Sequence, residues 1–70
     1  MQKDYDFNAL FKKHFEADKV MFGIETNLIE GTKSFIVHYW VSGVLKVIKE
    51  EMFPDESMAD AANRVWENEQ

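Results

Sequence analysis

The chain has 70 residues, of which 46% are hydrophobic and 14% aromatic, and it contains no cysteine. This length allows one domain over residues 1–70 with a small hydrophobic core, and the apolar content excludes a disordered chain. The lack of cysteine excludes disulfide bonds and thiolate metal sites and fits a reducing compartment. The first residues do not resemble a signal peptide, and no apolar run reaches about 18 residues. We therefore expect a cytoplasmic protein without a membrane segment.

Charge is distributed unevenly along the chain. Residues 1–49 hold six acids and seven lysines, a net charge of +1, whereas residues 50–70 hold seven acids and one arginine, a net charge of −6. An acidic surface of this kind attracts basic protein surfaces and repels phosphate. The alternative interpretation is a solvated helix face that keeps a small protein soluble.

The first half of the chain predicts a helix followed by a hairpin. Helical spacing of apolar side chains predicts a helix from Asp6 to Asp18, capped by Asp4 or Asp6; its apolar face comprises Phe7, Leu10, Phe11, His14 and Phe15. Alternation from Val20 to Leu28 indicates a half-buried strand. A turn over 30–33 then leads into a strand over 34–41, which is rich in β-branched and aromatic residues.

The segment from Val44 to Phe53 is compatible with either a strand or a helix. Its apolar residues would form a helical stripe, but Ser42 and Gly43 form the two-residue turn that a hairpin prefers, which favours a third strand. Pro54 ends the segment. Ser57 then opens a last helix that extends to about Glu69; its expected buried stripe comprises Met58, Ala61, Ala62, Val65 and Trp66.

These elements predict an α+β fold of order α-β-β-β-α, with a three-stranded antiparallel sheet and two helices packed on one face. The alternative is α-β-β-α-α. The order, the strand over 35–41 with its turn at Ser42-Gly43, and Ala61-Ala62 in the last helix resemble the double-stranded RNA-binding domain. That resemblance implies the fold, but RNA is not the expected ligand. The family's phosphate-binding lysines are replaced by Asp55 and Glu56, and the His that the family places after its first strand is missing from the turn over 30–33.

The predicted sheet has two apolar faces. The face under the helices should hold Phe22, Ile24, Leu28, Phe35, Val37, Tyr39, Val41 and Ile48. The opposite face should expose Met21 together with the candidate partner-binding residues Ile36, His38, Trp40, Leu45 and Val47. Because a monomer seldom exposes such a contiguous patch, the sequence predicts a non-catalytic protein-binding module whose partner is another protein or a second copy. If 44–53 were a helix, this patch would instead be core.

Two alternative functions follow from the charges. Glu56, Asp60 and Glu67 would line one side of the last helix and mimic nucleic acid in an inhibitor that occupies the groove of a basic partner protein, a type of protein typical of phages and mobile elements. Nucleic-acid binding through lysines is the weaker alternative; these are Lys12, Lys13, Lys19 and Lys33.

The sequence does not indicate a catalytic site or a metal site. His14 and His38 lack metal-ligand spacing, and no serine lies in a glycine-rich elbow. Neighbouring acids such as Glu50 and Glu51 would need a cleft to separate their pKa values, and a core of this size leaves little room for one. We therefore expect no enzymatic activity, no cofactor and no metal.

Overall fold

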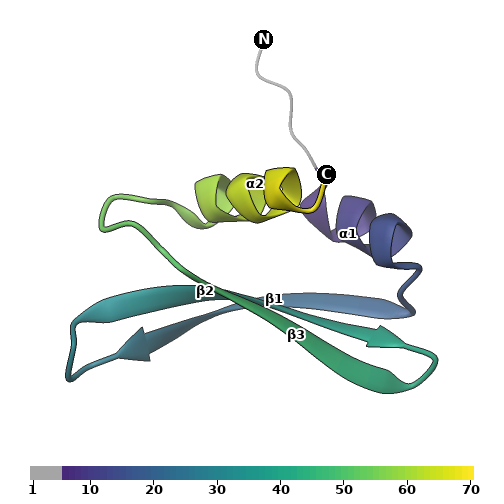
Figure 1. Cartoon of the computed structure of the whole chain (residues 1–70), viewed down its shortest axis with the longest axis horizontal. Helices are drawn as coiled ribbons and strands as arrows, with labels where there is room; N and C mark the ends of the chain where they lie inside the picture. The colour runs from purple at the N-terminus through teal and green to yellow at the C-terminus, as the bar shows by residue number, and fades with distance from the viewer. Residues whose placement is uncertain (1–5) are drawn as a thin grey trace, which may run out of the picture.

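The computed structural model describes residues 6–70 and has five regular elements. In chain order they are α1 (Phe7–Phe15), β1 (Lys19–Asn27), β2 (Thr32–Val41), β3 (Val44–Glu51) and α2 (Met58–Asn68). The strands form one antiparallel sheet in the order β1-β2-β3, and both helices lie on the same side of it (Figure 1). The predicted α+β fold of order α-β-β-β-α is confirmed, and the segment after Gly43 is a strand.

Local hydrogen bonds and backbone angles set where the helices begin and end. The Asp6 carboxylate accepts from the Ala9 amide at 3.1 Å at the start of α1, and the Ser57 hydroxyl accepts from the Asp60 amide at 3.1 Å at the start of α2. The alternative cap Asp4 lies outside the described residues. Helix α1 ends at Phe15, before the predicted Asp18, because Glu16 takes the left-handed conformation with φ 52°.

The β2–β3 turn explains why the last apolar segment is a strand. Ser42 and Gly43 both have positive φ, at 51° and 80°. Positive φ at both central residues is the type I′ arrangement, whose twist matches that of the flanking strands. Backbone pairing of β2 with β3 therefore continues directly from the turn.

The core lies between the helices and one face of the sheet. Phe11 is fully buried at its centre, and its ring centroid lies 5.4 Å from that of Trp66 and 5.7 Å from that of Phe22. Phe15 of α1 stacks on Tyr39 of β2 at 4.1 Å, which fixes the helix against the sheet. The other buried side chains are Ala17, Val20, Phe35, Val37, Met52, Ala61, Ala62 and Val65.

Some side chains assigned to the core from the sequence are exposed instead. Leu28 lies in the β1–β2 turn beyond the end of β1 and is 89% exposed. Ile24 and Met58 are also exposed, and both line an open hollow at the end of the sheet near this turn. His14, placed on the apolar face of α1, is exposed as well, with its Nε2 3.7 Å from Glu69 Oε1.

Candidate functional site

The sheet face turned away from the helices is the first candidate surface. Strand register sets cross-strand neighbours side by side, and residues two apart on one strand share a face. Three successive rows result, each given in the order β1, β2, β3: Lys19, Trp40 and Leu45; Met21, His38 and Val47; Gly23, Ile36 and Lys49. The structure therefore brings all five predicted sheet residues together on one surface, which we call the open face.

The apolar side chains of the open face are accessible to solvent. Met21, Leu45 and Val47 are 48%, 49% and 53% exposed. The three open-face residues of β2, Ile36, His38 and Trp40, are partly buried, because they lie between two neighbouring strands. Figure 1 shows no helix on this side of the sheet. A continuous apolar surface that spans three strands and is partly exposed to solvent is typical of a protein interface.

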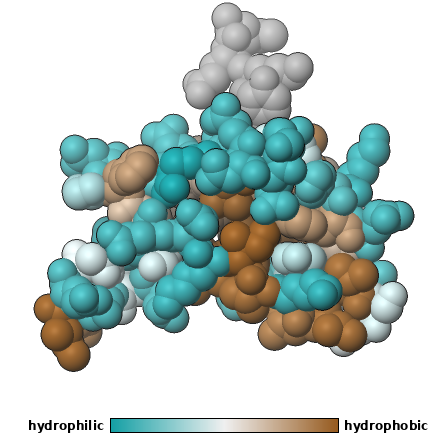
Figure 2. Space-filling view, viewed as in Figure 1, coloured by the Kyte–Doolittle hydropathy of each residue, from teal (hydrophilic) through white to brown (hydrophobic). Residues whose placement is uncertain are grey.

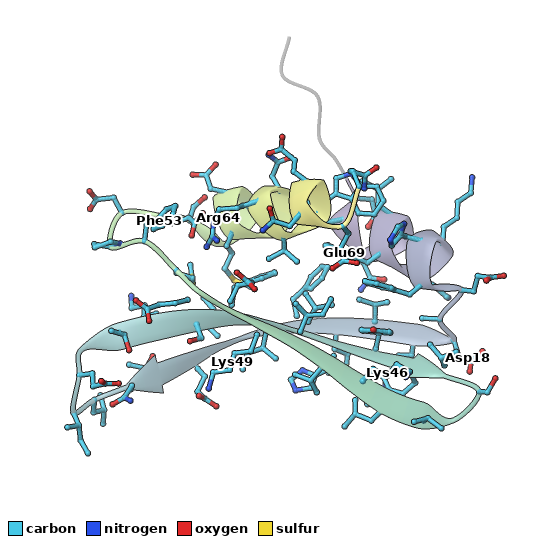
Figure 3. The ribbon with its side chains drawn as sticks, in the orientation of Figure 1. Asp18, Lys46, Lys49, Phe53, Arg64 and Glu69 are labelled. Atoms are coloured by element: carbon cyan, nitrogen blue, oxygen red, sulfur yellow. The ribbon has the colours of Figure 1, made fainter. Side chains whose placement is uncertain are left out.

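Charged side chains frame this apolar surface. The Lys19 ammonium lies 5.4 Å from the centroid of the Trp40 ring, a cation–π contact at one end of the face. Toward the other end, Lys49 Nζ lies 2.5 Å from Glu25 Oε1, so the pair bridges β3 and β1 across β2. Figure 3 shows Lys49 pointing away from the helices. The apolar rows therefore have charged side chains at both ends.

The predicted acidic row on the last helix is not a row of equivalent, free carboxylates. Glu56 precedes α2 rather than lying on it, its side chain is 7% exposed, and its two carboxylate oxygens accept from Arg64 Nε and Arg64 Nη2, each at 2.9 Å. Asp60 is in the first turn of α2, and Glu67 accepts from the Asn63 amide at 2.8 Å. The prediction that Glu56 lies on the helix is wrong, because Ser57 is the cap and the helix begins at Met58.

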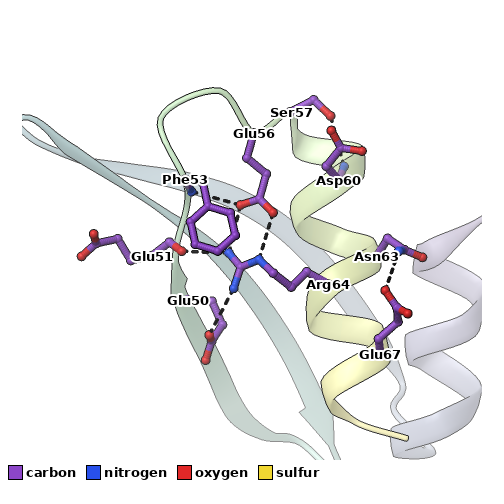
Figure 4. A network of polar contacts seen from close by, with 9 residues as sticks. All are labelled: Glu50, Glu51, Phe53, Glu56, Ser57, Asp60, Asn63, Arg64 and Glu67. Atoms are coloured by element: carbon purple, nitrogen blue, oxygen red, sulfur yellow. Dashed lines mark hydrogen bonds and ion pairs between the residues drawn. The ribbon is translucent and has the colours of Figure 1, made fainter.

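Arg64 connects α2 to the segment that follows β3 (Figure 4). Besides Glu56, it donates to the Glu51 carbonyl at 2.8 Å, and its guanidinium lies 4.5 Å from the Phe53 ring centroid. The hydrogen bond from Arg64 holds the pKa of Glu56 below its ordinary value, and the same pair raises the pKa of Arg64. Sequence reasoning missed this contact, although Arg64 is the only cation among residues 50–70.

A second surface, also missed from the sequence, lies at the end of the sheet that carries the β1–β2 turn. A hollow of about 310 Å³ opens between this hairpin and the connection from β3 to α2. Its apolar walls come from four different parts of the chain. The hollow is lined by Ile24, Gly31, Thr32, Lys33, Glu51, Met52, Phe53, Pro54, Glu56 and Met58.

The lysines proposed for nucleic-acid binding do not form one patch. Lys19 pairs with Trp40 and Lys33 with Thr26, so the two lysines lie seven residue pairs apart along the hairpin. At about 3.3 Å per residue this separates them by about 23 Å. They also point to opposite faces of the sheet, because successive residue pairs alternate between the two faces and seven is an odd number of pairs.

Among residues 6–70, no group of three or more His, Asp or Glu side chains could hold a metal ion. Within the same range, no helix has the length and apolar character needed to cross a membrane. Comparison with known proteins found no matching family model, no matching curated protein and no matching solved structure. The element order is compatible with the topology of a double-stranded RNA-binding domain.

Proposed function

We propose that the protein is a non-catalytic protein-binding module and that the open face is its binding surface. The observation that carries this proposal is the set of accessible apolar side chains at Met21, Leu45 and Val47, continuous with Trp40 and not covered by any element in residues 6–70. Trp and Met are enriched in interface cores, where their large apolar area contributes most of the binding energy.

The dimensions of the open face suit an amphipathic helix of the partner. Three strands about 4.8 Å apart give a surface about 10 Å across between the outer strands, which matches the diameter of one helix. The opposite face is covered by the protein's own two helices, α1 and α2 (Figure 1). A partner helix with apolar residues toward Val47 and an acid toward Lys19 would complete a third layer and pair with the charge at that end.

Two valines on β3 allow a matched test. Val47 and Val44 are similarly exposed, at 53% and 57%, but Val44 pairs with Val41 and so lies on the opposite face from Val47. We would compare Val47→Glu with Val44→Glu in affinity capture from the source cells. The captured partner would then be titrated into labelled protein while the Trp40 indole N–H signal is followed by NMR.

We expect Val47→Glu to weaken binding by at least about tenfold, because it places a charge within the apolar interface. Val44→Glu should bind normally, and the Trp40 signal should shift on binding. Equal affinities of the two variants, or a complex in which Trp40 does not shift, would contradict the proposal.

The two charge-based alternatives receive less support. An acidic inhibitor would need free carboxylates, but Glu56 is held by Arg64 and Glu67 accepts from Asn63. RNA binding would need clustered cations, but Lys19 and Lys33 are at opposite ends of the hairpin. Titration with duplex RNA at physiological salt should therefore show no saturable binding, and salt-sensitive binding would favour the RNA alternative.

A further inference from the structure

The end of the molecule with the β1–β2 turn exposes more large apolar side chains than the open face does. Leu28 and Ile29 in the turn are 89% and 96% exposed, and Ile24, Phe53 and Met58 are exposed around the adjacent hollow. These five are among the nine large hydrophobic side chains exposed within residues 6–70. Figure 2 shows apolar atoms at the tip of this hairpin. Such a concentration indicates an interaction surface.

The turn itself is firmly hydrogen bonded. The Asn27 side-chain oxygen accepts from the amides of Ile29 and Glu30 at 3.0 and 3.1 Å, and the Gly31 amide donates to the Asn27 carbonyl at 2.8 Å. Gly31 has φ 70°, which glycine adopts without strain. Leu28 and Ile29 are therefore held away from the sheet in a defined turn, so little ordering entropy opposes their burial by another molecule.

The hollow is large enough for these two side chains, and part of its lining is apolar. A cavity of about 150 Å³ lined by apolar side chains can hold benzene, which has six carbons. The hollow measures about 310 Å³, and the side chains of Leu28 and Ile29 have eight carbons in total. Its apolar lining includes Met52, Phe53 and Met58.

We propose that the chain self-associates by inserting Leu28 and Ile29 of one copy into the hollow of a second copy. The turn and the hollow are adjacent, because Gly31 at the end of the turn and the next two residues, Thr32 and Lys33, line the hollow. A single two-fold axis can therefore make the exchange reciprocal, with the same surface used by both copies.

One charge in the turn is complementary to one charge at the hollow. Glu30 lies in the turn and Lys33 lines the hollow, and neither forms an ion pair within residues 6–70. Glu51 and Glu56 also line the hollow, and the Glu56 carboxylate is paired with Arg64. Insertion would bring Glu30 of one copy near Lys33 of the other, twice in the dimer. Because each copy inserts only two side chains, we expect the dimer to be weak and to depend on concentration.

Sedimentation velocity over a concentration series tests the proposal. The double variant Leu28→Ser with Ile29→Ser should fold normally by circular dichroism, because both side chains are in solvent, and should weaken self-association by at least about tenfold. The control Val47→Ser changes the open face and should leave the dimer intact. In a mixture of isotope-labelled and unlabelled protein, we expect NMR contacts between Leu28 methyl groups of one copy and Met58 of the other.

A wild-type protein that stays monomeric up to millimolar concentration would overturn the proposal. So would a dimer that Val47→Ser abolishes and the turn variant leaves intact, since self-association would then use the open face. The result is separable from the proposed function, because the turn variant keeps the open face and should still bind the captured partner.

Discussion

Three valines in the sheet allow the two faces to be compared with one substitution. Val37 on the helix side is fully buried, whereas Val47 on the open face and Val44 at the start of β3 are 53% and 57% exposed. Replacing Val37 by Ala removes two buried carbons, at about 0.8 kcal/mol each by transfer, and leaves a small cavity. We expect a loss of about 2 to 3 kcal/mol of unfolding free energy, out of a total of about 4 to 10 kcal/mol for 70 residues.

Val47→Ala should lower the unfolding free energy much less, by at most about 1 kcal/mol, because roughly half of the side chain is already in water. Part of this small loss comes from the lower strand propensity of alanine. Val44→Ala should give a similar small loss and serves as the propensity control. Urea unfolding at low protein concentration, analysed with equal slopes, measures all three values. A loss at Val47 as large as that at Val37 would refute the reasoning, because it would mean that the open face is buried in the isolated chain.

Two further predictions concern backbone strain and pH. Ser42→Asn should raise the unfolding free energy by about 0.5 to 1 kcal/mol, since Ser42 has φ 51° and Asn-Gly is a preferred type I′ sequence. Gly43→Ala should lower the unfolding free energy by backbone strain alone, because a Cβ at this position would meet no atom within 4 Å. Thermal unfolding of both variants checks these signs, and a stabilised Gly43→Ala would contradict the expectation. Because Arg64 lowers the pKa of Glu56 below its ordinary value of 4.5, the stability this pair contributes is present above that pH and lost as the pH falls through the lowered pKa. Glu56→Gln should therefore be less stable than wild type at neutral pH and approach it in acid, as urea unfolding over a pH series would show. Equal profiles for Glu56→Gln and wild type would rule out the contact.

The order and type of the elements could be predicted from the sequence because local signals agree with the fold. Helical periodicity, strand alternation and the Ser42-Gly43 turn each act over a few residues, and the structure confirms the elements that they predict. Burial was harder to predict. Alternation correctly placed Ile24 on the helix side of β1, but it could not show that this position lines an open hollow rather than the closed core.

The prediction of an acidic row on the last helix was wrong for a related reason. Spacing of 3.6 residues per turn applies only within a helix, and Glu56 lies just before the cap. Its contact with Arg64 spans eight residues and depends on how the chain turns after β3, which no local pattern specifies. In contrast, the open-face residues were correctly grouped, because the strand period of two and the hairpin register together determine which side chains share a face.

The sequence of β2 gives a physical reason for assigning a partner to the open face. Its residues from Phe35 to Val41 are apolar or aromatic at almost every position, with His38 as the only polar exception. A strand that is apolar on both sides is typical of burial on both faces of a sheet, whereas a strand with one wet face shows alternation. Within residues 6–70, both helices cover a single face (Figure 1). We propose that the second layer for which β2 is suited is supplied by the partner that binds the open face.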